Sequence, residues 1–280
     1  MIVLESAVEF RAHCETLRQE GPLGLVPTMG FLHAGHVSLI DQARAQSRHV
    51  AVTIFVNPAQ FGPREDLSRY PRDLQGDLAK CQAAGVAVAF APKSNETLYP
   101  PGFQTYIEPG PLAAPLEGER RPGHFRGVCT VVAKLFTLSR ADAAFFGEKD
   151  FQQLRVVQQM TTDLDLGTQI VPCPIVRESD GLAMSSRNAY LSADERKRAV
   201  SLSRGIGIAQ ALYATSERRP SFLIGAAMEP MRMADLRIDY VALADPNTLL
   251  PPETPQGNSR LLLAAFCGAT RLIDNAPLEP

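Results

Sequence analysis

The stretch LGLVPTMGFLHAGHVSLI, residues 23–40, combines a strand pattern, a glycine-containing turn and a helix pattern. Its apolar beginning, residues 23–26, predicts a short buried strand, and the residues from His36 to about 47 predict a helix. A turn that contains Gly30 and Gly35 joins the two. In open α/β sheets such a turn lies at the carboxyl edge of the sheet, where ligands bind. We therefore expect a binding site at this turn.

Strand and helix candidates alternate through the first part of the chain. Strand candidates occupy residues 50–56, 86–91, 143–146 and 169–176, and helix candidates occupy residues 5–20, 71–84, 128–138 and 151–160. This alternation predicts an α/β fold with a doubly wound parallel sheet. After residue 176 come a long helix at about 193–214, a second helical segment and two strand candidates at 237–243 and 260–267. We expect an α/β domain over residues 1–175 and a smaller α+β domain over residues 176–280.

The composition is typical of a globular protein without a strong charge. The 280 residues include 28 Lys and Arg against 30 Asp and Glu, which argues against a nucleic-acid-binding surface spread over the molecule. Five cysteines without a C-x-x-C pair indicate small buried side chains, neither a disulfide framework nor a zinc site. The N-terminus lacks the basic segment of a signal peptide, and no stretch approaches 18 uncharged apolar residues. We expect no membrane contact and a cytoplasmic location.

His33 and His36 stand three residues apart at the start of the expected helix. A helix N-terminus presents free N–H groups and partial positive charge to an anion, and Gly35 permits close approach of the backbone. Both imidazoles can donate to phosphate oxygens. A zinc site would need a third ligand, and none lies nearby in the sequence. The glycine spacing matches neither G-x-G-x-x-G nor the P-loop, so the H-x-G-H sequence indicates the nucleotidyl-transferring α/β enzymes.

Two further polar segments follow expected strands. Residues 184–187, Met-Ser-Ser-Arg, offer two hydroxyls for phosphate oxygens and Arg187 as a bidentate clamp. Residues 147–150, Gly-Glu-Lys-Asp, lie between a strand and a helix, where a bound anion would account for Lys149 at a helix start. Because ATP brings about four negative charges, positioned cations and donors must stabilise it. The candidate catalytic set is His33, His36, Lys149 and Arg187.

Five segments in order along the chain indicate a known family. They are VPTMGFLHAGHVSLI, TIFVNPAQF, GHFRGVCTVVAKLF, FFGEKDFQQL and VRESDGLAMSSRNAYLS, from about residue 25 to 192. Together they resemble the pantothenate synthetase (pantoate–β-alanine ligase) family of the H-x-G-H nucleotidyltransferase superfamily. The resemblance implies a Rossmann-like domain that binds ATP and pantoate and a smaller lid-like C-terminal domain. It also implies a homodimer that uses Mg²⁺.

The resemblance further implies an AMP-forming ligase of pantothenate biosynthesis. ATP would activate pantoate as pantoyl adenylate with release of pyrophosphate. The amine of β-alanine would then attack the adenylate, giving pantothenate and AMP. The partners of such an enzyme are the small molecules pantoate, β-alanine and ATP, with no nucleic acid.

The same resemblance implies roles for individual residues. The implied ATP-binding residues are Met29, Gly30, Phe31, Leu32, His33, Ala34, Gly35, His36, Gly147, Glu148, Lys149, Asp150, Val176, Met184, Ser185, Ser186 and Arg187. His36 would act as proton donor, and Val176 would present its backbone to adenine. Gln60 and Gln153 would hold pantoate, with Gln60 also touching β-alanine. A glutamine suits this substrate because it can donate to a carboxylate and accept from a hydroxyl.

This chain departs from the family pattern at two places. Ala34 stands where members commonly carry an acidic residue, and we expect little consequence because it lies between the histidines. Gly76 and Asp77 stand where members often carry an acidic pair, which leaves Asp77 as the candidate Mg²⁺ ligand. We expect Mg²⁺ to be coordinated mainly by the phosphates and by water, because this ion gives up its bound water reluctantly.

Two other functions stay open at this point. One is an H-x-G-H nucleotidyltransferase that stops after the transfer, although N-P-A-Q-F and D-F-Q-Q-L fit a small polyol-acid better than a phosphorylated acceptor. The other is a non-catalytic nucleotide-binding regulator, which would keep the phosphate contacts and tolerate the loss of His36.

Overall fold

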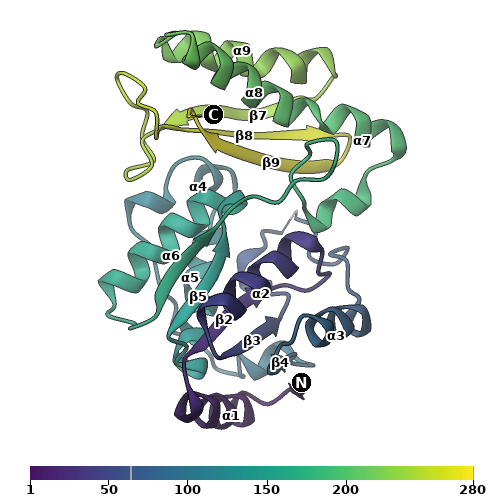
Figure 1. Ribbon diagram of the computed structural model, residues 1–280, viewed down its shortest axis with the longest axis vertical. Helices are drawn as coiled ribbons and strands as arrows, with labels where there is room; N and C mark the ends of the chain where they lie inside the picture. The colour runs from purple at the N-terminus through teal and green to yellow at the C-terminus, as the bar shows by residue number, and fades with distance from the viewer. Residues whose placement is uncertain (64, 280) are drawn as a thin grey trace. The chain divides into compact units, whose positions relative to one another are not determined.

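The computed structural model describes residues 1–63 and 65–279, which form two compact units (Figure 1). The first unit comprises Met1–Glu148 and Gln152–Pro174, and the second comprises Lys149–Phe151 and Ile175–Pro280. The division after Pro174 lies one residue before the expected boundary. The assignment of residues 149–151 to the second unit was not expected, and it places Lys149 with the C-terminal part of the chain.

A six-stranded parallel sheet forms the centre of the first unit. In chain order its strands are β1 (Ile2–Leu4), β2 (Leu23–Thr28), β3 (His49–Ile54), β4 (Val88–Phe90), β5 (Ala143–Gly147) and β6 (Gln169–Cys173). They lie in the order β1-β4-β3-β2-β5-β6, and each neighbouring pair is parallel. The chain builds outward from β2 in one direction and from β5 in the other. The predicted doubly wound sheet is thus confirmed, with its switch point between β2 and β5.

Helices cover both faces of this sheet. They are α1 (Ala7–Glu20), α2 (Ala34–Gln46), α3 (Leu74–Ala83), α4 (Glu117–Arg120), α5 (His124–Ser139) and α6 (Phe151–Asp163), with the 3-10 helices η1 (Pro58–Gln60), η2 (Asn95–Thr97), η3 (Pro111–Ala113) and η4 (Glu148–Asp150). Val26 and Val52 share a core with Ile40 of α2. Leu25 and Ala51 alternate with them along the strands and are also fully buried, so apolar residues point to both faces.

The second unit contains a three-stranded antiparallel sheet and helices. After η5 (Ser186–Tyr190) come α7 (Ala193–Ala199), α8 (Ser201–Ala214) and α9 (Pro220–Met233), then β7 (Arg237–Ala244), β8 (Arg260–Cys267) and β9 (Thr270–Pro277). Helices α8 and α9 lie together on one face of the sheet (Figure 1). Leu202, Leu223 and Met231 of these helices share a core with Leu261 and Leu263 of β8. The predicted smaller α+β part is confirmed.

Several elements differ from the sequence-based expectation. Helix α2 begins at Ala34, two residues earlier than predicted, and the predicted helix 193–214 is divided at Val200 into α7 and α8. Strand β1 was not predicted because three residues at a sheet edge carry little periodic signal. Strand β9 was not predicted because the adjacent polar residues Asp274 and Asn275 interrupt its apolar pattern, although both are buried.

The cysteines are buried free thiols, as the sequence predicted. Burial raises the pKa of the Cys81 thiol to about 11 and that of the Cys129 thiol to about 12. Both thiols are therefore protonated and unreactive at neutral pH.

In residues 1–63 and 65–279 no helix has the length and apolar character needed to cross a membrane.

Candidate active site

Two of the predicted site segments leave the sheet at its switch point. The H-x-G-H turn follows the end of β2 at Thr28, and the G-E-K-D segment begins at Gly147, where β5 ends. Strands β2 and β5 pair directly and run parallel. Because parallel strands end at the same edge of a sheet, both segments start at the carboxyl edge where ligands bind in such folds.

The histidines of the H-x-G-H turn cap their own helix. His33 is the N-cap residue of α2, and its Nδ1 accepts the backbone N–H of Gly35 at 3.1 Å. The Nδ1 atom of His36 in turn accepts the backbone N–H of His33 at 3.3 Å. This reciprocal arrangement is a capping box made of two imidazoles, where Ser or Thr and Glu are usual. It accounts for the early start of α2, and it corrects the expectation that these two N–H groups are free for an anion.

The same two hydrogen bonds set the tautomers of the rings. A neutral imidazole whose Nδ1 accepts a hydrogen bond carries its proton on Nε2. The rings of His33 and His36 lie against each other, with centroids 4.1 Å apart and an interplanar angle of 38°. In their neutral forms both side chains therefore have an Nε2–H donor, which is the group that phosphate binding needs.

Gln60 lies at the end of η1, just beyond β3. Its side chain is buried, its Oε1 accepts from Nδ2 of Asn57 at 3.0 Å, and its Nε2 lies 3.2 Å from Sδ of Met29. The hydroxyl of Tyr99 donates to Oδ1 of Asn57 at 2.7 Å, and Asn57 also donates to the carbonyl oxygen of Gly127 at 3.1 Å. These bonds orient the Gln60 amide toward Met29, a residue of the predicted ATP segment.

A buried histidine holds the backbone of Gln60. Nδ1 of His124 lies 2.9 Å from the carbonyl oxygen of Gln60, and a guanidinium nitrogen of Arg121 lies 3.0 Å from Nε2. Because arginine only donates, Nε2 accepts and Nδ1–H donates to Gln60. Arg121 is itself bound by both carboxylate oxygens of Glu65, at 2.9 and 2.7 Å. Burial and then the Arg121 charge lower the pKa of His124 to about 4, so the ring is neutral at neutral pH.

Helix α5 approaches η1 closely at a glycine. A Cβ atom on Gly127 would lie 2.2 Å from the carbonyl oxygen of Ala59 and 2.6 Å from the backbone nitrogen of Gln60. Sequence reasoning missed Gly127, His124 and Arg121 as positioning residues, although the segment GHFRGV, which contains Gly127 and His124, was part of the resemblance. A G-H-F-R-G sequence at a helix start was the available signal.

The two glutamines of D-F-Q-Q-L have different environments. Gln152 is buried, accepts the N–H of Glu117 at 2.9 Å, and donates to the carbonyl oxygens of Leu112 and Pro115 at 2.9 and 2.7 Å. Gln153 is half-buried and, as the next residue of α6, points to another side of the helix. The hydrogen bonds of Gln152 thus hold the loop before α4. Pantoate binding by Gln153 stays a prediction.

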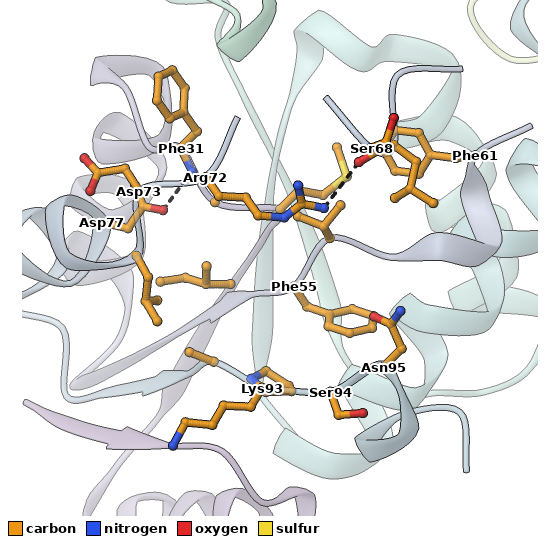
Figure 2. A pocket seen from close by; sticks show the side chains of 18 of the residues that line it. Phe31, Phe55, Phe61, Ser68, Arg72, Asp73, Asp77, Lys93, Ser94 and Asn95 are labelled. Carbon is orange, nitrogen blue, oxygen red and sulfur yellow. Dashed lines mark hydrogen bonds between the residues drawn. The ribbon is translucent and has the colours of Figure 1, made fainter. Parts of the chain in front are cut away.

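A cavity of about 830 Å³ lies beside the H-x-G-H turn in the first unit (Figure 2). Met29, Gly30 and Phe31 of the predicted ATP segment contribute to its lining. Arg72 reaches across the cavity in Figure 2 and donates to the carbonyl oxygens of Leu67 and Tyr70 at 3.2 and 3.0 Å. The predicted segment therefore borders a space of the size that small ligands occupy.

Asp77 also lines this cavity, but its carboxylate is bonded within the protein. The two oxygens accept the backbone N–H groups of Phe31 at 2.7 Å and Leu32 at 2.6 Å, and the side chain is 1% exposed. Across the residues that the structure describes, no group of three or more His, Cys, Asp or Glu side chains could hold a metal ion. The donor set around Asp77 does not fit Mg²⁺, which prefers octahedral oxygen ligands.

In the second unit, the predicted residues 176 and 184–187 form one hydrogen-bonded turn. The N–H of Met184 donates to the carbonyl oxygen of Val176 at 2.9 Å, so this carbonyl is occupied within the protein. Ser185 is the N-cap of η5 and accepts the N–H of Arg187 at 3.3 Å, and Ser186 is buried. The hydrogen bond between Val176 and Met184 thus joins the predicted adenine residue to the predicted residues 184–187 in one loop, residues 176–188.

Strand β9, which sequence reasoning missed, holds two of the predicted segments of the second unit. Asp274 accepts from both terminal nitrogens of Arg177 at 2.7 and 2.9 Å, and this bond anchors the loop 176–188. Asn275 donates to the carbonyl oxygen of Lys149 at 2.8 Å and accepts from Arg260 at 2.7 Å. The Lys149 ammonium lies 3.6 Å from the Asp150 carboxylate. The predicted nucleotide residues of this unit therefore depend on two buried polar residues of one strand.

The predicted set is divided between the two units. The first unit contains the residues 29–36, Gln60, Gly147, Glu148 and Gln153, and the second contains Lys149, Asp150, Val176 and the residues 184–187. Within each unit the structure brings neighbouring members together as described above. That both groups contact one nucleotide stays a prediction.

Curated proteins similar to this chain include pantothenate synthetases of several bacteria. The family model described as pantoate-beta-alanine ligase matches residues 2–277. A pantothenate synthetase of Myxococcus xanthus (strain DK1622) is 55% identical over 279 residues, covering 99% of this chain and 96% of that protein. A pantothenate synthetase of Roseiflexus sp. (strain RS-1) is 52% identical over 281 residues, covering 100% of both.

Two solved structures of the same kind of enzyme match as well. The pantothenate synthetase from Thermus thermophilus matches with a TM-score of 0.95 at 45% identity, over 100% of both chains. The pantoate-beta-alanine ligase from Francisella tularensis matches with a TM-score of 0.83 at 33% identity, over 100% of this chain and 98% of that one. The Francisella structure is a complex with beta-gamma ATP and beta-alanine.

A doubly wound sheet with H-x-G-H at its switch point fits the class that the sequence predicted, the nucleotidyl-transferring α/β enzymes. The match over nearly the whole length of the chain narrows this class to one family. The chain belongs to the pantoate–β-alanine ligase family, whose members here are named pantothenate synthetases.

Proposed function

We propose that this enzyme condenses pantoate with β-alanine in two steps at the expense of ATP. In the first, a pantoate carboxylate oxygen bonds to the α-phosphorus of ATP, and the bond from that phosphorus to the β-phosphate bridge breaks to release pyrophosphate. In the second, the β-alanine amine attacks the acyl carbon of pantoyl adenylate, AMP leaves, and the nitrogen loses a proton. Family membership supports this reaction, as do beta-gamma ATP and beta-alanine in the Francisella relative.

The observation that carries the proposal is the pair of imidazoles at the switch point. Both Nδ1 atoms accept backbone N–H groups, so the neutral rings of His33 and His36 have Nε2–H donors at the carboxyl edge of β2. We assign His36 to donate to the phosphate oxygens on which charge grows during adenylation, and His33 to hold a neighbouring phosphate oxygen. Donors fixed before the reaction stabilise growing charge without reorganising.

Pantoate has a carboxylate and hydroxyl groups, and we assign it to Gln60 and Gln153. The Gln60 amide is buried and its direction is set by Asn57, which supports a fixed binding position. Amides bring no nucleophile of their own, so they do not compete with the substrate carboxylate. Holding that carboxylate in line with the α-phosphorus supplies a large part of the rate, because oriented reactants gain orders of magnitude in effective concentration.

From the second unit we assign Lys149 and the residues 184–187 to the phosphates, and the backbone of Val176 to adenine. The bonds that Asn275 and Asp274 make to the segments carrying Lys149 and Arg177 support this assignment, because they hold the two segments from one strand. Residues 176–280 would then act as a lid. The resemblance also supports a homodimer that works in the cytoplasm.

We propose that Mg²⁺ reaches the site on the ATP phosphates, largely coordinated by water and phosphate oxygens. It would neutralise phosphate charge there. The bonded carboxylate of Asp77 offers no open set of oxygen ligands, and the steps above rest on the protein side chains alone.

The nucleotide products test the reaction. Purified enzyme with pantoate, β-alanine and ATP should release AMP and pyrophosphate in equal amounts, as measured by anion-exchange chromatography. With pantoate but without β-alanine, a burst of pyrophosphate equal to the enzyme concentration should appear. Release of ADP and phosphate would refute the proposal, and so would formation of AMP at the same rate when pantoate is left out.

A further inference from the structure

The turn before His33 has an uncommon backbone. Gly30 has φ +87° and Phe31 has φ +52°, so two consecutive residues lie in the left-handed region. Glycine tolerates this region, whereas a side chain such as that of Phe31 rarely adopts it. Such conformations persist only where the surrounding structure holds them. The contacts of this turn therefore show what fixes the position of the histidines that follow.

The turn is held from both sides. On the strand side, the Thr28 hydroxyl accepts the N–H of Gly30 at 3.2 Å and donates to the carbonyl oxygen of Thr53 at 2.7 Å. On the helix side, the Asp77 carboxylate accepts the N–H groups of Phe31 and Leu32 at 2.7 and 2.6 Å. Figure 2 shows the bond between Phe31 and Asp77. His33, the N-cap of α2, comes directly after these bonds.

Asp77 is placed for this contact by helix α3. The helix begins at an N-cap, Asp73, which accepts the N–H of Gly76 at 3.0 Å, and the N–H of Asp77 donates to the Asp73 carbonyl at 2.8 Å. The Asp77 carboxylate also lies so close to the turn that a Cβ on Gly30 would be 3.0 Å from Oδ2. A carboxylate with both oxygens on backbone N–H groups makes short, charge-assisted bonds.

We propose that Asp77 is a positioning residue that acts through the backbone of the turn 30–32, and that it is not a Mg²⁺ ligand. Its carboxylate holds Phe31 and Leu32, and these residues set where the imidazoles of His33 and His36 lie. The inference rests on the proposed function, because it is the adenylation that requires those imidazoles in place. Displacement of a reacting group by about 1 Å can cost about 10²-fold in rate.

The test replaces the carboxylate by an amide of the same shape. In Asp77→Asn one oxygen still accepts a backbone N–H, while the amide nitrogen faces the other N–H as a second donor. We expect adenylation, measured as pantoate-dependent pyrophosphate exchange into ATP, to fall about 10²-fold, mainly in kcat. The matched control is Asp73→Asn, which removes the same charge four residues away on the same helix. Asparagine is a good N-cap, so this variant should keep the wild-type rate.

A second measurement separates positioning from metal binding. The Mg²⁺ concentration for half-maximal rate at fixed ATP should stay within about twofold of wild type in Asp77→Asn, because the ion is carried by phosphate. A tenfold higher Mg²⁺ requirement, with the rate restored at high Mg²⁺, would show a direct ligand and overturn the inference.

Hydrogen exchange of the turn supplies a readout that does not depend on activity. The amides of Phe31 and Leu32 should exchange at least tenfold faster in Asp77→Asn, whereas those of the α5 core should exchange as in wild type. Unchanged exchange in the turn, or faster exchange throughout the protein, would contradict the positioning role. An inactive wild-type enzyme would instead refute the proposed function, so the two failures are distinguishable.

Discussion

The turn 28–36 of the first unit and the loop 176–188 of the second unit carry the predicted nucleotide residues, and they are held by different interactions. In the turn, a carboxylate that is 1% exposed bonds to backbone N–H groups, and two imidazoles cap the helix. In the loop, Arg177 pairs with Asp274, whose side chain is 1% exposed, and Arg196 pairs with Glu178, whose side chain is 34% exposed. The two arginine side chains are 30% and 24% exposed.

The difference indicates how each region responds to conditions. Bonds between a buried group and the backbone are little affected by dissolved ions, whereas ion pairs with partly exposed members are screened by salt. The Arg196–Glu178 pair is screened more than the Arg177–Asp274 pair, because Asp274 is buried. We therefore expect the turn to be sensitive to small changes of shape and the loop to be sensitive to ionic strength.

Replacement of His36 separates its two roles in the turn. In His36→Asn the side-chain oxygen can take the place of Nδ1 and cap the helix, but no donor remains at the place of Nε2. We expect adenylation to fall at least about 10²-fold, up to about 10³-fold, because one fixed donor to growing charge is lost. His36→Gln places an amide donor near the Nε2 position and should recover part of the rate. A wild-type rate of pyrophosphate exchange in His36→Asn would remove His36 from the chemistry.

Gly127→Ala tests the sensitivity to shape near Gln60. The added methyl would lie 2.2 Å from the Ala59 carbonyl oxygen, so α5 must move away from η1. Overpacking of this kind costs about 2–3 kcal/mol of unfolding free energy. We also expect KM for pantoate to rise more than KM for ATP, because the displaced residue is Gln60. The control is Gly207→Ala in α8, where a Cβ meets no atom within 4 Å. Equal stability of the two variants in urea would contradict the close-contact account.

His124 makes the contacts around Gln60 dependent on pH. The ordinary histidine pKa is 6.5, and in the folded chain the His124 pKa is about 4. Between these values the unfolded chain binds a proton that the folded chain does not. The free energy of unfolding should therefore fall as the pH drops below 6.5, by about 2 kcal/mol at pH 5. Urea unfolding at pH 7.5 and pH 5 measures the loss. His124→Asn keeps a donor toward Gln60 without titrating, so a pH dependence equal to wild type in this variant would contradict the assignment.

Asp274→Asn tests the loop 176–188. The amide keeps one acceptor for Arg177 but loses the charge, so we expect KM for ATP to rise about tenfold, equivalent to about 1.4 kcal/mol. The control is Asp239→Asn, which weakens the pair of Asp239 with Arg271, at 2.8 Å in the same sheet. The salt dependence of KM should be shallower in Asp274→Asn than in wild type. A control variant with the same change in KM would show that charge alone, and not the anchoring of the loop, is responsible.

The fold could be predicted to a large extent because its signals are local. Apolar runs at 23–26 and 50–56 separated by helical segments lead directly to a doubly wound sheet, and H-x-G-H places the site at its edge. The capping by His33 and His36 could not be predicted, because imidazoles are unusual caps and no sequence pattern marks them as such.

The positioning residues could not be predicted because their partners lie far away in the chain. Asp77 binds the N–H of Phe31 across 46 residues, and Asn275 binds the carbonyl of Lys149 across 126 residues. No spacing rule connects such positions. Their polar character in the sequence is equally compatible with a solvated surface, and burial is visible only once the strands and helices are assembled.

Transfer of an oxygen atom from pantoate to AMP distinguishes a pantoyl-adenylate pathway from other routes to pantothenate. In the first proposed step, a pantoate carboxylate oxygen becomes bonded to the α-phosphorus, and that oxygen leaves with AMP in the second step. Pantoate labelled with ¹⁸O in both carboxylate oxygens should therefore give AMP that carries one ¹⁸O atom and pantothenate that keeps one in its amide carbonyl, as mass spectrometry would show. AMP without the label, formed together with pantothenate, would contradict the pantoyl-adenylate pathway.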